Sequence, residues 1–219
     1  ESTMPAQEYL DAQVVANKPI SIATHSETLV ASAPPPATLI GANTCPKFKA
    51  VQNNFEYLRE IVGNNAAISH VVKGNAYGHG ISTYVPLAVE LGAKHFSTFD
   101  AHEAHQVYNA VNCDATLMVM GMIDNEELDW AIEHQIEFFV FDIDRLKKAV
   151  AIARKMNTQA RVHIELETGL NRTGFEKDQI AEVMELIKAN VEVLQVKGFC
   201  THFAGAESYA NFFRVKEQY

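Results

Sequence analysis

The sequence alternates short apolar runs, rich in β-branched residues, with longer segments whose apolar residues recur at helical spacing. From Ile68 onward this alternation repeats six times. Regular alternation of strands and helices is typical of βα units, which build a parallel sheet. Right-handed crossovers wind such a sheet into an arc. The sequence therefore predicts an α/β fold of the (β/α) TIM-barrel type.

The predicted elements are bounded by helix-start and helix-stop residues. Asp100, Asp124 and Asp142 stand where helix N-caps belong, Pro46 suits a first helical turn, and Gly63 suits a helix stop. Strands are expected at residues 38–43, 68–73, 95–99, 115–120, 136–141, 161–166 and 193–201. Helices are expected at residues 46–62, 82–91, 101–111, 124–134, 142–156, 177–189 and from 208 onward.

A closed barrel needs eight βα units, typically in about 250 residues, and this sequence of 219 residues supplies two fewer. We therefore expect residues 38–219 to form an incomplete barrel from a longer protein; the alternative is that another chain covers the gap. Residues 1–37 are rich in Ala, Ser, Thr and Gln and end in Pro34-Pro35-Pro36. They are predicted to be an N-terminal arm or linker that could contain a short helix at 5–15.

The charge and the hydropathy pattern exclude some functions. The net charge of −9 argues against binding to nucleic acid or to an anionic membrane surface, although it is compatible with a local basic pocket for a phosphate. No apolar run is long enough to span a bilayer. The N-terminus lacks the features of a signal peptide, as a cleaved mature form also would. The cytoplasm is the expected compartment, with a periplasmic or organellar location as the alternative.

The cysteines, three methionines and Trp130 are predicted to have structural roles. Three cysteines, far apart in the sequence, suggest neither a disulfide framework nor a metal site, so reduced thiols are expected. Core packing is expected for Cys200 on its apolar strand, and also for the apolar residues in and after the strand at 115–120. The cysteines are Cys45, Cys113 and Cys200, and the apolar residues are Met118, Met120, Met122 and Trp130.

The strongest chemical signal is the run Lys73-Gly74-Asn75-Ala76-Tyr77-Gly78-His79-Gly80, which follows the apolar run at 68–72. In (β/α) barrels the functional side chains lie at the carboxyl ends of the strands. A lysine held there against an apolar interior is disfavoured in its charged form, so its amine can become a nucleophile. The hydroxyl of Tyr77 could reach the same pocket.

This run resembles the pyridoxal-phosphate lysine motif of the alanine racemase family. The segment from His163 to Phe175, His-Ile-Glu-Leu-Glu-Thr-Gly-Leu-Asn-Arg-Thr-Gly-Phe, is similar to the second signature of that family. The segment from Gly198 to Ala204, Gly-Phe-Cys-Thr-His-Phe-Ala, is similar to its Thr-His-Phe-Ala strand end. The three segments agree in order and spacing. The resemblance covers roughly residues 38–219, which are therefore similar to the N-terminal part of a barrel that binds pyridoxal 5'-phosphate.

The resemblance implies a role for each matching residue. Lys73 would form a Schiff base with the cofactor and exchange the α-proton on one face of the substrate. Tyr77 would bind the cofactor phosphate, Arg172 the ring region of the cofactor and the substrate carboxylate, and His202 the cofactor ring. Glu165 departs from the pattern, because many members carry a carbamylated lysine there. We expect its carboxylate to position Arg172 without a carbamate.

Without the resemblance, each of these side chains has an ordinary structural explanation. Lys73 and Arg172 would be solvated surface residues, Tyr77 a packed aromatic, and His202 a structural histidine. Glu165 and Glu167, which strand alternation places on one face together with His163, would be a solvent-facing acidic pair. No metal site is expected at His202, because no second ligand stands at a suitable spacing.

The resemblance implies an isomerase: a homodimeric amino-acid racemase that interconverts L- and D-alanine, or a broader set of amino acids. Its second base, a tyrosine from a C-terminal β-domain across the dimer interface, and other parts of the site lie outside this sequence. Two alternatives remain. One is a barrel protein that binds pyridoxal phosphate without racemase activity, and the other is an inactive subunit of a larger assembly.

Overall fold

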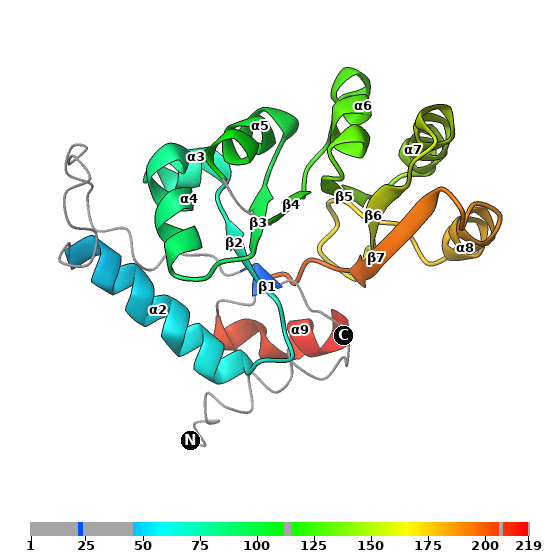
Figure 1. Ribbon diagram of the computed structural model, residues 1–219. Coiled ribbons are helices and arrows are strands. Elements are labelled where there is room, and N and C mark those ends of the chain that lie inside the picture. The colour runs from blue at the N-terminus through cyan, green and yellow to red at the C-terminus, as the bar shows by residue number, and fades with distance from the viewer. Residues whose placement is uncertain (1–21, 24–45, 112–114, 206–207, 219) are drawn as a thin grey trace. The chain divides into compact units, whose positions relative to one another are not determined.

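The computed structural model describes residues 22–23, 46–111, 115–205 and 208–218 (Figure 1). The chain divides into two compact units, which we describe separately. In the described part of the chain, the first unit ends at Met122 and the second begins at Ile123. No helix in this part is long and apolar enough to cross a membrane.

The first unit contains four parallel strands that pair in the order of the sequence. These are β1 (Ile22–Ala23), β2 (Ile68–Val71), β3 (His95–Thr98) and β4 (Thr116–Val119). Its helices are α2 (Pro46–Val62), α3 (Lys73–Tyr77), α4 (Ile81–Glu90) and α5 (Ala101–Ala110), and α4 and α5 lie side by side (Figure 1).

Helical spacing explains which face of these helices is buried. Val85 and Ala88 on α4, and Ala104 and Val107 on α5, are three residues apart and fully buried, so each pair lies on one face. The strand residue Phe96 is also fully buried. The core of this unit is therefore built from one apolar stripe of each helix packed with residues of the sheet.

The second unit repeats the arrangement. The strands β5 (Glu137–Val140), β6 (Ala160–Glu165) and β7 (Leu194–Cys200) are parallel and pair in sequence order. Its helices are α6 (Asn125–Glu133), α7 (Ile143–Met156), α8 (Ile180–Lys188) and α9 (Phe212–Gln218), the last preceded by the 3-10 turn η3 (Tyr209–Asn211). Leu146, Ala149 and Ala153 form the buried stripe of α7.

The structure confirms the predicted alternation from β2 to β7, with small shifts at the element ends. The strand before Lys73 ends at Val71, and Lys73 itself begins α3. Gly63 has a φ of 67° and follows α2, as expected of a helix stop. The strand predicted at 38–43 and the helix predicted at 5–15 lie outside the described residues. The strand β1, within the predicted arm, was not expected, and the domain boundary at residue 37 stays a prediction.

The predicted helix caps have mixed outcomes. The side chains of Asp100 and Asp142 accept hydrogen bonds from the backbone N–H of Glu103 and Arg145, so both caps are confirmed. Asp124 is the N-cap residue of α6, but its side chain makes no cap bond. Its backbone carbonyl, which is enough to begin a helix, instead accepts from the N–H groups of residues 127 and 128.

The prediction of core packing after β4 is correct for one methionine and wrong for another. Met118 lies within β4 and is fully buried. Met122 is 59% exposed and lies past the end of β4, beyond the continuous buried run of that strand. Met120 and Trp130 are half-buried.

Candidate active site

The segment after Lys73 adopts a left-handed helical turn. Gly74, Asn75, Ala76 and Tyr77 have φ values of 61°, 53°, 55° and 52°. For residues other than glycine, this conformation costs about 1–2 kcal/mol each. Backbone strain of this kind persists only where the surroundings enforce it, and it is concentrated at functional sites.

Backbone hydrogen bonds close this turn on both sides. The N–H of Ala76 donates to the carbonyl of Val72 at 2.7 Å, and the N–H of Gly80 donates to the carbonyl of Asn75 at 2.9 Å. The side-chain oxygen of Asn75 accepts from the N–H of Ile81 at 2.9 Å and thereby caps α4. The turn is therefore fixed between the end of β2 and the start of α4.

The turn brings together the first two predicted site residues. The Nζ atom of Lys73 lies 5.9 Å from the centre of the Tyr77 ring, within the range of a cation–π contact. Gly78 and Gly80 have φ values of 85° and 86°, a conformation that glycine adopts at little steric cost. The left-handed Ala76 and Tyr77 were not predicted, because neither residue type favours this conformation.

Glu165 is the last residue of β6 and is 2% exposed, so the alternative of a solvent-facing acidic pair is wrong for this residue. Burial raises its pKa, although a hydrogen bond from Thr173 and the charge of Arg172 act to lower it and the charge of Glu167 adds to the increase. Its Oε2 atom is buried and has no hydrogen-bond partner in the described part of the chain. The carboxyl group therefore interacts electrostatically with Arg172, but one of its two oxygen atoms lacks a hydrogen bond in the described part of the chain.

Glu167 lies beyond the strand end, so strand alternation does not place it. Its carboxylate accepts from the backbone N–H groups of Gly169 and Arg172, the second at 3.2 Å. Desolvation acts to raise the pKa of Glu167, but hydrogen bonds from the N–H groups of residues 171, 169, 172 and 170 lower it overall. This carboxylate holds the loop that carries Arg172, whose side chain is exposed.

The two ends of this loop are also pinned together. The N–H of Glu167 donates to the carbonyl of Phe175 at 3.1 Å, and the N–H of Phe175 donates to the carbonyl of Glu165 at 2.8 Å. Gly174 has a φ of 127°, and a Cβ atom there would lie 2.4 Å from the backbone nitrogen of Glu167. Only glycine permits this close approach.

His202 is half-buried and follows β7. Its carbonyl accepts from the side-chain amide of Gln218 at 3.1 Å, and the N–H of Ala204 donates to the same amide at 2.8 Å. Gln218 also donates to the hydroxyl of Thr168 at 3.4 Å, and that hydroxyl is 2.6 Å from the hydroxyl of Thr201. The segment that carries His202 is thus tied to the loop after β6. No pattern in the sequence singles out Gln218, since one glutamine on a helix is unremarkable.

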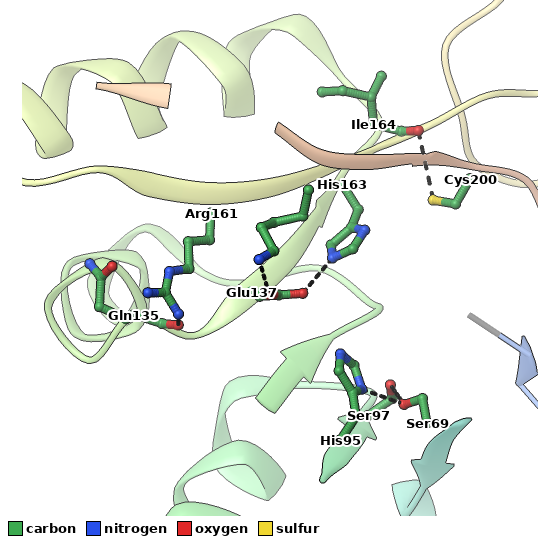
Figure 2. Close-up of polar contacts among 10 residues, drawn as sticks. Ser69, His95, Ser97, Gln135, Glu137, Arg161, His163, Ile164 and Cys200 are labelled. Carbon is green, nitrogen blue, oxygen red and sulfur yellow. Dashed lines mark hydrogen bonds and ion pairs between the residues drawn. The ribbon is translucent and has the colours of Figure 1, made fainter. Parts of the chain in front are cut away.

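The thiol of Cys200 is unsuited to act as a nucleophile. Burial, together with the negative charge of Glu165, raises its pKa far above the ordinary value. Its sulfur lies 3.7 Å from the carbonyl of Ile164, to which it donates (Figure 2). The residue is therefore a protonated, largely structural thiol, as expected. Cys45 and Cys113 lie outside the described residues.

A second polar cluster, which was not predicted, crosses the three strands of the second unit. Glu137 on β5 accepts from Nε2 of His163 on β6 at 2.6 Å and lies 3.3 Å from Nζ of Lys197 on β7. Figure 2 shows the carboxylate of Glu137 turned toward His163. Because Phe139 pairs with His163, Glu137 lies on the same face of the sheet as His163. The shared face of His163 and Glu165 stays a prediction.

In the first unit, Ser69 on β2 and Ser97 on β3 are joined through their hydroxyls at 2.5 Å (Figure 2). The Nδ1 atom of His95 lies 2.8 Å from the hydroxyl of Ser69. Both serines are buried, so this small network satisfies their polar atoms between neighbouring strands.

Comparison with known proteins identifies the family of the chain. Residues 47–218 match the sequence model of the family described as alanine racemase, N-terminal domain. The chain is 34% identical over 161 residues to an alanine racemase of Desulforamulus reducens. The solved alanine racemase from Streptomyces coelicolor A3(2) superimposes with a TM-score of 0.71 at 26% identity, over 77% of this chain and 46% of that chain. The alanine racemase from Streptomyces lavendulae does so with a TM-score of 0.68 at 31% identity, over 77% and 44%.

The match extends over most of the described residues, so the chain belongs to the alanine racemase family through its N-terminal domain. This membership, together with the parallel strands and alternating helices, confirms the predicted fold class. The match to the Desulforamulus reducens racemase covers 73% of this chain and 43% of that protein. The chain thus spans less than half of the curated relative.

Proposed function

We propose that the protein to which this chain belongs is a pyridoxal-phosphate-dependent racemase that interconverts L- and D-alanine. The observation that carries the proposal is Lys73, which follows a parallel strand and begins a strained left-handed turn in a chain of the alanine racemase family. The cytoplasm is the proposed compartment, supported by three widely separated cysteines that do not suggest a disulfide framework. A homodimer is part of the proposal.

The donor set fits the cofactor. The amine of Lys73 can react with the aldehyde group of the cofactor, and the hydroxyl of Tyr77 on the same turn can donate a hydrogen bond to its phosphate. When bound, pyridoxal phosphate supplies a conjugated, electron-accepting ring system that acidifies the α-proton of an amino acid. Lys73 would hold the cofactor and carry the α-proton on one face of the substrate carbon, at its Nζ atom. Another residue of the whole protein would act on the opposite face.

The remaining side chains would bind and orient. Arg172 would bind the substrate carboxylate and the ring region of the cofactor, since a guanidinium matches the planar geometry of a carboxylate. Glu167 holds the backbone at Arg172, and Glu165 would act on the guanidinium through its charge. His202 would pack against the cofactor ring, in a segment tied down by Gln218.

Two measurements on the full-length protein test the proposal. Absorbance after incubation with pyridoxal phosphate should show the band of the lysine-bound cofactor, and Lys73→Ala should abolish it. Lys94→Ala, which changes an exposed lysine of the same unit, should keep it. Chiral chromatography after incubation with L-alanine and other L-amino acids should show D-alanine as the main product. A band that survives in Lys73→Ala, or L-alanine that stays unconverted, would contradict the proposal.

A further inference from the structure

We infer that Glu103 is a positioning residue that holds the left-handed turn after Lys73 in its strained conformation. The inference rests on the proposed function for its consequence, namely that the turn presents the Lys73 amine to the cofactor. Glu103 itself touches neither the lysine amine nor any reacting atom. It acts through the backbone of the neighbouring segment.

The carboxylate of Glu103 connects two segments that are far apart in the sequence. Its Oε1 atom accepts from the backbone N–H of Asn75 at 3.2 Å, and its Oε2 atom accepts from the backbone N–H of Phe99 at 3.0 Å. Asn75 lies within the left-handed turn, whereas Phe99 directly follows β3. One half-buried side chain therefore joins the carboxyl ends of the neighbouring strands β2 and β3.

Helix capping alone does not account for these contacts. Asp100 and Glu103 have the spacing of a capping box, in which the N-cap side chain accepts from the N–H three residues on and the glutamate reaches back to the N–H of the N-cap. The first half of this exchange is present, since the N–H of Glu103 donates to Oδ1 of Asp100 at 2.9 Å. The carboxylate of Glu103, however, accepts from Phe99 and Asn75 instead.

Phe99 provides a firm anchor for this link. Its N–H is bound by Glu103, and its carbonyl accepts from the N–H of Gly121 at 2.8 Å. Gly121 approaches so closely that a Cβ atom there would lie 2.4 Å from the same carbonyl oxygen. The ends of β3 and β4 are thus held together, and Glu103 extends this hold to the turn after β2.

The link matters because the turn is strained. Asn75, Ala76 and Tyr77 all have a positive φ, so the backbone relaxes to other conformations where its hydrogen bonds are lost. The apparent affinity for a ligand falls in proportion to the fraction of molecules in the competent conformation. Loss of the Glu103 carboxylate should therefore weaken cofactor binding without any change in the residues that touch the cofactor.

The test uses the full-length protein and the variants Glu103→Ala and Glu103→Gln. Cofactor affinity is measured by titrating the absorbance band of lysine-bound pyridoxal phosphate, and backbone protection by amide hydrogen exchange at Asn75 and Phe99. Asp142→Ala is the control for a weakened helix start, because it removes the N-cap bond to the N–H of Arg145 from α7 in the other compact unit. It corrects for the loss of stability that follows when a helix start is weakened.

For Glu103→Ala we expect the dissociation constant of the cofactor to rise by about tenfold, the effect of one charge-assisted hydrogen bond, and exchange at Asn75 to accelerate. Glu103→Gln keeps one acceptor and should show a smaller rise. Asp142→Ala should leave both measurements unchanged. Equal affinity and equal exchange in Glu103→Ala and Asp142→Ala would overturn the inference.

The same measurements separate this inference from the proposed function. If the parent protein shows no cofactor band, the proposed function is wrong, and the exchange rates alone then decide the role of Glu103 in the turn. Faster exchange at Asn75 in Glu103→Ala supports that role, and unchanged exchange rejects it. If the band is present and lost in Lys73→Ala, but Glu103→Ala binds cofactor with parental affinity, only the inference fails.

Discussion

The backbone N–H of Arg172 lies 3.2 Å from Oε2 of Glu167, a carboxylate five residues earlier in the chain. The other oxygen of this carboxylate accepts from the N–H of Gly169. The carboxylate of Glu167 thus binds two backbone N–H groups of the loop, much as an N-cap side chain binds the first N–H groups of a helix. The side chain of Arg172 is exposed, so the hydrogen bonds to Glu167 hold Arg172 through its backbone.

Glu167→Gln should destabilise the protein by about 0.5–1 kcal/mol, because the amide presents only one acceptor oxygen to the loop and the site is partly screened by solvent. In the proposed enzyme it should also raise KM for the amino acid more than it lowers kcat. Urea unfolding and steady-state kinetics measure the two effects. The control is Glu182→Gln, which alters an exposed ion pair with Lys147 and should change neither value measurably.

The pH dependence gives a second readout for the same residue. The pKa of Glu167 is lowered from 4.5 in the folded protein, so its stabilising contribution is fully present above that unfolded value. The contribution is lost as the pH falls through the lower pKa of the folded state. The parent should therefore lose more stability than Glu167→Gln on acidification. Parallel stability curves for the two proteins would show that the loop does not depend on this charge.

Glu165→Gln tests the proposed positioning of Arg172 and has the opposite pH dependence. Burial raises the pKa of Glu165 above 4.5, so its contribution to stability is complete below the unfolded value and is lost as the pH rises through the higher pKa of the folded state. The unfolding free energy of the parent should show this decline toward neutral pH, and that of the variant should not. Urea unfolding over a pH series measures the difference.

The same variant should impair the proposed enzyme. Without the negative charge beside Arg172, we expect the guanidinium to lose its preferred orientation and kcat/KM to fall by about tenfold. Glu176→Gln, an exposed residue just beyond the loop, should leave kcat/KM at the parental value. Unchanged activity and unchanged cofactor binding in Glu165→Gln would remove Glu165 from the site.

Glu137→Gln should be the most destabilising of the charge-removing variants. Glu137 is 3% exposed and contacts both His163 and Lys197. Removing one member of a buried ionic group leaves the others without compensation, at a cost of about 3 kcal/mol. Glu192→Gln is the matched control, because Glu192 contacts Arg154 at 3.1 Å but both side chains are more than half exposed. Urea unfolding should show little or no loss of stability for Glu192→Gln; similar losses in both variants would contradict the importance of burial.

Local chemistry explains what could be predicted from the sequence. The alternation of apolar periodicities predicted the strands and helices from β2 to β7, and the side chains of Asp100 and Asp142 predicted two helix starts. Gly63 predicted the stop of α2, where its φ is 67°. Each of these features depends on residues within a few positions, where propensity and capping act.

Contacts between distant segments explain what could not be predicted. Glu137 meets His163 because β5 and β6 pair in a particular register, and no pattern within either strand specifies that register. Glu103 reads as half of a capping box, yet it binds Asn75 on another segment. The left-handed conformation of Ala76 opposes its own propensity. Tertiary structure overrides local preference at these positions, and two of them, Glu103 and Ala76, shape the turn after Lys73.

Gly121→Ala tests the anchor at the end of β3. Its backbone is not left-handed, but an added Cβ atom would lie 2.4 Å from the carbonyl oxygen of Phe99 and 2.9 Å from its ring. The carbonyl belongs to the backbone and cannot turn aside, so we expect a loss of about 2–3 kcal/mol in urea unfolding. Gly63→Ala is the reciprocal control, because Gly63 has a φ of 67° and open space around its Cα. Gly63→Ala should lose only about 1 kcal/mol through backbone strain.

If Gly63→Ala is the more destabilising variant, the close approach of Gly121 to Phe99 does not restrict the residue type at position 121. If Gly121→Ala is the more destabilising, amide exchange at Phe99 and Asn75 should accelerate together, because Glu103 joins the two segments.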